Sequence, residues 1–98
     1  MKIIWSQTAL NKADEISDFI AYDNITEAKK WIKQLFVEVE RLKIFPEFGC
    51  SVPNFNDEKL REIIFGNYRI IYEIKKTSIE ILTIWHSKRL LNKESFKR

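Results

Sequence analysis

The sequence has few of the residues that cross-link small secreted proteins or interrupt regular structure. Cys50 is its only cysteine, so the chain forms no internal disulfide, and one thiol is not a metal site. This composition fits a reducing compartment, and we expect a cytoplasmic protein without a metal ion or other cofactor. Only two glycines and two prolines occur, so most of the backbone should lie in helices and strands.

Long hydrophobic runs are missing as well. The apolar run near the start, residues 3–5, is too short for the core of a signal peptide. No stretch approaches the roughly 18 apolar residues of a membrane-spanning helix, so we expect a soluble chain without membrane contact. The hydrophobic share of 45% nevertheless supports a packed core, and 98 residues predict a single domain, 1–98.

The net charge of +3 is unevenly distributed along the chain. Residues 1–58 contain seven Lys or Arg and ten Asp or Glu, a net charge of −3. Residues 59–98 contain ten Lys or Arg and four Glu, a net charge of +6. The basic surplus predicts a polyanionic or acidic partner for the C-terminal part, although solubility alone would also explain it.

The N-terminal half predicts one strand followed by two helices. Residues 2–5 are rich in β-branched side chains, and Ser6 or Thr8 can cap a helix that fades near Tyr22. A second helix is predicted from Thr26 to about residue 44, because its apolar residues recur at helical spacing: Ala28, Trp31, Ile32, Leu35, Phe36, Val39 and Leu42.

Two polar or ring-constrained positions delimit these helices. Asn24, with Glu27 three residues later, resembles a capping box at the start of the second helix. Pro46 should end that helix because it lacks an amide hydrogen. The short connection between the helices predicts an antiparallel hairpin with one apolar side.

The C-terminal half predicts a loop and then strands. Residues 46–57 contain both prolines and should form a loop that packs against the protein through Phe48 and Phe55. Three apolar segments follow and predict an antiparallel meander, 60–65, 68–74 and 79–85, with Gly66-Asn67 as the tight turn of the first hairpin. We expect residues from about 87 to 98 to form a C-terminal tail or a short helix. The predicted fold class is α+β, in the order β-α-α-β-β-β.

Several segments in this order resemble the RelE/ParE toxin superfamily, from Ile3 to about Leu91. They are Pro46–Gly49 with Val52-Pro53, Leu60-Arg61-Glu62, Tyr68-Arg69-Ile70-Ile71-Tyr72, and Ile81–His86 with Lys88-Arg89. The resemblance implies the toxin of a type II toxin–antitoxin system, neutralised by a cognate antitoxin. It also implies a homodimer or a toxin–antitoxin hetero-oligomer as the possible assembly.

The resemblance leaves two targets open. Members similar to ParE bind and inhibit DNA gyrase, whereas members similar to RelE cut messenger RNA on the ribosome. Metal-free RNA cleavage needs a base, an acid and cations around the phosphate. If the chain is RelE-like, Arg61, Arg69 and His86 are the candidate catalytic residues, and we expect them to converge on the sheet face opposite the helices.

A wider set of residues is expected to contact the target or its phosphates. It comprises Arg61, Tyr68, Arg69, Lys88 and Arg89. Arginine suits this role because its guanidinium matches the oxygens of a phosphate.

The sequence departs from the RNA-cleaving pattern in two places. Asn54 cannot act as a base where some of those enzymes carry one, and no tyrosine follows His86. Glu62 is an alternative base, but strand alternation directs it away from Arg61. We therefore favour a ParE-like gyrase inhibitor, and we predict that Arg69→Ala keeps the fold and relieves toxicity.

Less specific interpretations remain for these residues. Arg69 can pair with Glu73 or Glu80 as part of the fold, and His86 can be an ordinary hydrogen-bonded histidine. Lys29, Lys30 and Lys33 are interpreted as the solvated face of the second helix. A nucleic-acid-binding module without toxicity is the third functional possibility.

Overall fold

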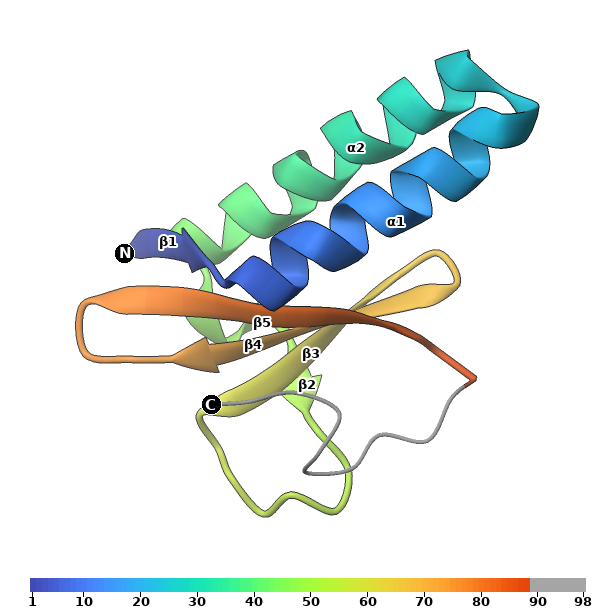
Figure 1. Cartoon of the computed structure of the whole chain (residues 1–98). Helices are drawn as coiled ribbons and strands as arrows, with labels where there is room; N and C mark the ends of the chain where they lie inside the picture. Colours follow the sequence, from blue (N-terminus) through green and yellow to red (C-terminus); the bar gives the residue numbers. More distant parts are fainter. Residues whose placement is uncertain (89–98) are drawn as a thin grey trace.

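The computed structural model describes residues 1–88. It contains a five-stranded sheet with a helical hairpin packed on one side (Figure 1). The strands are β1 (Lys2–Trp5), β2 (Cys50–Ser51), β3 (Leu60–Phe65), β4 (Tyr68–Ile74) and β5 (Ser78–His86). The predicted tail, 87–98, lies outside the described part of the chain except for its first two residues.

The strand order is β1-β5-β4-β3-β2. The predicted α+β class and the β3–β4–β5 meander are confirmed, but β1 runs parallel to β5, so the sheet is mixed and not purely antiparallel. The sequence analysis also missed β2, which pairs with Arg61 and Glu62 of β3. A two-residue strand has too few positions to show an alternating pattern, and its pairing depends on where the loop folds back.

The helical hairpin consists of α1 (Gln7–Asp23) and α2 (Ile25–Glu40). Ser6 caps α1 by accepting a hydrogen bond from the Ala9 amide at 3.0 Å. The same hydroxyl donates to the Leu82 carbonyl at 2.8 Å, which fixes the start of α1 against β5. No described helix is long and apolar enough to cross a membrane.

A single residue, Asn24, joins the two helices. Its side-chain oxygen accepts from the Glu27 amide at 3.1 Å, as the predicted cap requires. Its own amide donates to the Ile20 carbonyl at the end of α1. The Asn24 amide is therefore already bonded. It does not donate to the Glu27 side chain, the second contact that a full capping box would have.

The end of α2 differs from the prediction. The α-helix stops at Glu40 and continues as the 3₁₀ turn η1 (Arg41–Lys43), well before Pro46. Pro46 instead begins a second 3₁₀ turn, η2 (Pro46–Phe48), where its missing amide hydrogen is not needed. In the β3–β4 turn, Gly66 has a φ of 59° and Asn67 does not have positive φ, which is the pattern of a type II′ turn.

Both faces of the sheet carry buried apolar side chains. The larger cluster lies under the helices and includes Leu35, Val39, Leu42, Ile63, Ile70, Tyr72, Ile79, Ile81 and Ile84. The smaller cluster lies on the opposite face and consists of Val52, Leu60, Ile71 and Leu82. Phe55 packs against this smaller cluster, as predicted for the loop, while Phe48 is about half exposed.

A register shift between β4 and β5 changes the side-chain directions along β5. Ile71 pairs with Thr83 and Tyr72 pairs with Ile81, so Leu82 is an extra residue in β5. The alternation therefore changes parity at this bulge. Ile84 joins Ile81 in the helix-side cluster, whereas strict alternation would have placed it on the opposite face.

Candidate functional site

The three candidate catalytic residues do not converge. Arg61 has the same strand parity as Ile63, which lies under the helices, and His86 pairs with Tyr68, which contacts α2. Arg69 has the parity of Ile71 and lies on the opposite face. The expectation of a single catalytic face is therefore wrong, and its physical reason is the alternation of side chains along each strand.

Arg61 and His86 are also separated along the sheet. Arg61 pairs with Tyr72 and His86 pairs with Tyr68, four residues away on β4. At the rise of an antiparallel strand this separation is roughly 13 Å. The functional roles expected for Arg61, Arg69 and His86 stay predictions.

Arg69 forms an ion pair with Glu62 on the face opposite the helices. The guanidinium and the carboxylate lie 3.4 Å apart, and their side chains are 13% and 10% exposed. The predicted partner, Glu73 or Glu80, is therefore replaced by a residue of the neighbouring strand. Glu80 instead pairs with Lys75 at 3.0 Å.

Arg61 holds the loop that precedes β2. Its Nη1 donates to the Gly49 carbonyl at 2.9 Å, and its Nε donates to the Glu58 carbonyl at 3.0 Å. These bonds join β3 to the residue before β2 and to the end of the β2–β3 connection. The guanidinium therefore supports the fold here, whatever else it contacts in a complex.

Tyr72 of β4 also binds the loop that precedes β2. Its hydroxyl donates to the Pro46 carbonyl at 2.7 Å and accepts from the Gly49 amide at 2.9 Å. Burial raises the pKa of this phenol above its ordinary value of 10.0, and the Gly49 hydrogen bond and the Arg61 charge oppose that shift. A Cβ at Gly49 would lie 2.6 Å from the Glu62 carbonyl oxygen, so only glycine allows this approach.

His86 ends a row of aromatic contacts that runs from β3 across α2 to β5. Phe65 contacts Trp31, Trp31 contacts Tyr68, and Tyr68 meets His86 edge to face at 5.7 Å. The Lys88 amide donates to His86 Nδ1 at 3.2 Å, so the neutral ring carries its proton on Nε2. Tyr68 is thus a packing residue in this fold, and Arg89 lies beyond the part of the chain described.

A cavity of about 200 Å³ opens beside His86. It is bordered by Lys12, Glu15 and Trp85, and the Lys12 ammonium lies 5.9 Å from the centre of the Trp85 ring. Its lining combines the Lys12 ammonium, the Glu15 carboxylate and the rings of Tyr68, Trp85 and His86. It has no second cation from Arg61 or Arg69, so its composition does not match a site for phosphate cleavage.

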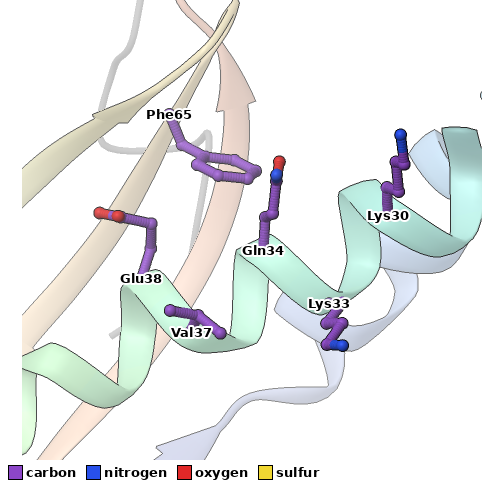
Figure 2. A pocket seen from close by; sticks show the side chains of 6 residues that line it. All are labelled: Lys30, Lys33, Gln34, Val37, Glu38 and Phe65. Carbon is purple, nitrogen blue, oxygen red and sulfur yellow. The ribbon is translucent and has the colours of Figure 1, made fainter.

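The sequence analysis missed a groove along α2. It has a volume of about 570 Å³ and is lined by Lys30, Lys33, Gln34, Val37, Glu38 and Phe65. Figure 2 shows the Phe65 ring reaching from β3 toward α2, with Gln34 and Glu38 on either side of it. Lys30 and Lys33 therefore border a partly apolar groove and are not only a solvated face. The signal that could have revealed it is Val37, an apolar residue off the buried stripe of the helix.

The candidate catalytic side chains are engaged in separate contacts. Within residues 1–88, no group of three or more His, Cys, Asp or Glu residues is placed to hold a metal ion. Arg69 is engaged with Glu62, Arg61 is engaged with loop carbonyls, and His86 lies apart from both. No base, acid and phosphate-binding cation share one site among these residues.

Comparison with known proteins agrees with the observed fold. Residues 3–91 match the model of a protein family described as the ParE toxin of the type II toxin–antitoxin system parDE. Comparison with curated proteins finds no match.

A solved structure has the same fold. It is the chromosomal ParDE toxin–antitoxin system from P. aeruginosa, with a TM-score of 0.74 and 20% sequence identity. The alignment covers 90% of this chain and 97% of that chain. Since the family model spans most of the sequence and the fold agrees, this chain belongs to the ParE toxin family of type II toxin–antitoxin systems.

Proposed function

We propose that this protein arrests bacterial growth by binding and inhibiting DNA gyrase in the cytoplasm. Membership of the ParE family supports this activity. The observation that carries the choice of target is the separation of Arg61, Arg69 and His86, because an inhibitor that acts by binding does not need these side chains in one site.

The endoribonuclease alternative receives less support. Its proposed base and cations lie on two faces of the sheet, and Glu62, the remaining candidate base, is paired with Arg69 at 3.4 Å. Cleavage on the ribosome would require these groups to move together. The third possibility, a nucleic-acid-binding module without toxicity, rests only on the charge of +6 in residues 59–98.

We further propose a cognate antitoxin as the physiological partner. The solved relative is described as a ParDE system, which pairs a toxin with its antitoxin. An acidic antitoxin segment would complement the basic C-terminal half, and the groove between α2 and Phe65 offers apolar contact beside Lys30 and Lys33. A toxin–antitoxin hetero-oligomer is accordingly favoured over a toxin homodimer.

Induction of the protein in a bacterium tests the proposed function. We expect growth arrest, filamentous cells and DNA-damage signalling, with messenger RNA intact. Co-expression of the antitoxin encoded in the adjacent reading frame should restore growth. Rapid cleavage of transcripts within codons would support the ribonuclease instead, and unimpaired growth would contradict both toxin functions.

A further inference from the structure

The helices cover one face of the sheet, and the other face is covered only in part. Figure 1 shows α1 and α2 together on one side, with the connection between β2 and β3 on the other. On that second side Phe55 packs on a small buried cluster, Val52, Leu60, Ile71 and Leu82. Farther along β3, Ile64 has the strand parity of Leu60 and is 63% exposed. A sheet with apolar side chains on both faces needs a cover on each, and the cover at Ile64 is incomplete.

Ile64 belongs to a row of paired residues across three strands, which we name the open row and define as Ile64, Arg69 and Trp85. Ile64 pairs with Arg69 of β4, and Arg69 pairs with Trp85 of β5. The Arg69 guanidinium lies 3.4 Å from the Glu62 carboxylate, and these two side chains are only 13% and 10% exposed. Apolar residues placed over the open row would bury Ile64 without separating the two charges.

The described part of the chain ends at the same end of the sheet. His86 pairs with Tyr68, and the Ser87 amide donates to the Asn67 carbonyl at 2.8 Å, so the chain leaves β5 beside the β3–β4 turn. Residues 89–98 follow, and an extended segment of this length spans roughly 33 Å. The open row crosses three neighbouring strands, a width of roughly 10 Å. Residues 89–98 are therefore long enough to reach every part of the open row.

The helix side of this end of the sheet is already filled. Phe65, Trp31, Tyr68 and His86 form a continuous series of aromatic contacts there. The opposite side has an accessible surface, because Ile64 keeps 63% of its exposure. The chain that leaves β5 thus meets packed aromatic rings on one side and an exposed isoleucine on the other.

The composition of residues 89–98 suits a cover for an apolar surface. Leu90, Leu91 and Phe96 are large and apolar, and every other residue of the segment is polar or charged. Contact between these three side chains and Ile64 removes apolar surface from water on both partners. The charged neighbours can stay in water while the apolar residues are buried.

We propose that the open row is the docking surface for residues 89–98 of the same chain, whose apolar side chains pack on Ile64 and over the Arg69–Glu62 pair. The segment is then a second cover beside Phe55. Docking also holds on this face four of the basic residues that give residues 59–98 their charge of +6, namely Arg89, Lys93, Lys97 and Arg98. The inference does not depend on the target of the toxin, so it stands or fails separately from gyrase inhibition.

Thiol reactivity at position 64 tests the docking in the full chain. Cys50 is exposed, so Cys50→Ser removes the background, and Ile64→Cys then places a single thiol in the open row. The reaction rate scales with the fraction of molecules in which the row is uncovered, so docking in about nine molecules of ten slows it about tenfold. We expect the triple variant Leu90→Ser/Leu91→Ser/Phe96→Ser to restore the fast rate. Ile44→Cys, at a position that is 75% exposed and outside the open row, is the matched control whose rate should not change.

Thermal unfolding of the full chain gives a second measurement. Ile64→Ser and the triple variant should each lower the Tm, and their combination should lower it no further than the triple variant alone, because both remove the same contact. Additive losses of Tm would overturn the inference, and so would a rate at position 64 that the triple variant leaves unchanged. Protection that grows with protein concentration would assign the cover to a second copy and overturn it. A rate change at Val37→Cys in place of position 64 would assign the segment to the groove along α2, with the same consequence.

Discussion

The two faces of the sheet bury their side chains in different ways. Under the helices, residues such as Leu35, Ile70 and Ile81 form one continuous apolar cluster. On the opposite face, four apolar residues share the surface with the Arg69–Glu62 ion pair, whose side chains are almost as inaccessible. The cluster under the helices thus buries apolar side chains and the Tyr72 phenol, whereas the opposite face also buries a charge pair that a partner or a mutation can disturb.

A core truncation under the helices tests the first half of this comparison. Leu35→Ala removes a fully buried side chain from α2 and leaves a cavity against the sheet. We expect the free energy of unfolding to fall by about 3–4 kcal/mol. Urea denaturation measures the loss, and Val37→Ala, at an exposed position of the same helix, should change it little. Equal effects of the two variants would show that α2 does not bury the face described.

Removal of one partner of the ion pair tests whether the face opposite the helices depends on it. Arg69→Met leaves the Glu62 carboxylate with little water contact, so we expect a loss of about 3 kcal/mol. The double variant Arg69→Met/Glu62→Leu should regain most of it, because no charge then remains buried. The prediction that Arg69→Ala leaves the fold intact is revised accordingly. Toxicity of the stable double variant decides whether Arg69 also contacts the target.

Tyr72 connects the sheet to the loop before β2. Tyr72→Phe leaves the Gly49 amide and the Pro46 carbonyl without their partner, at an expected cost of about 2 kcal/mol. Burial raises the pKa of Tyr72, so the folded state favours the neutral phenol. The stability that Tyr72 adds relative to Phe is therefore fully present below pH 10.0, the ordinary pKa of tyrosine. It decreases as the pH rises above that value. Denaturation of both proteins across that range checks the sign.

The smallest effect is expected where the helices meet the sheet. Ser6→Ala removes the cap of α1 and the hydrogen bond to Leu82, and we expect a loss of about 1 kcal/mol. Ser6→Thr keeps a hydroxyl and serves as the control. Thermal unfolding followed by circular dichroism compares the three proteins, and a Ser6→Ala protein as stable as wild type would mean that packing alone positions α1.

Local patterns predicted the elements well because their causes are local. Asn24 caps α2 through its own side chain, and Gly66 provides the positive φ of the β3–β4 turn. The helical stripe from Ala28 to Leu42 follows from burial on one side. These features depend on residues a few positions apart, so the local sequence is enough to predict them.

Features that depend on residues far apart in the chain could not be predicted from the sequence. The parallel pairing of β1 with β5 joins segments that are far apart in the chain, and the bulge at Leu82 interrupts the alternation of side chains along β5. The partner of Arg69 could not be chosen among several glutamates without knowing which strands are neighbours. The groove beside Phe65 arises only when the tip of the β3–β4 hairpin approaches α2.

Titration of DNA gyrase with the purified toxin tests the central claim, that this chain acts by binding. Relaxed plasmid, a fixed gyrase concentration and increasing toxin are followed by gel electrophoresis, and a parallel translation reaction reports messenger RNA integrity. We expect inhibition that saturates near a stoichiometric ratio of toxin to gyrase, with intact transcripts. Repeated cleavage of messenger RNA by small amounts of toxin, with supercoiling unaffected, would contradict it.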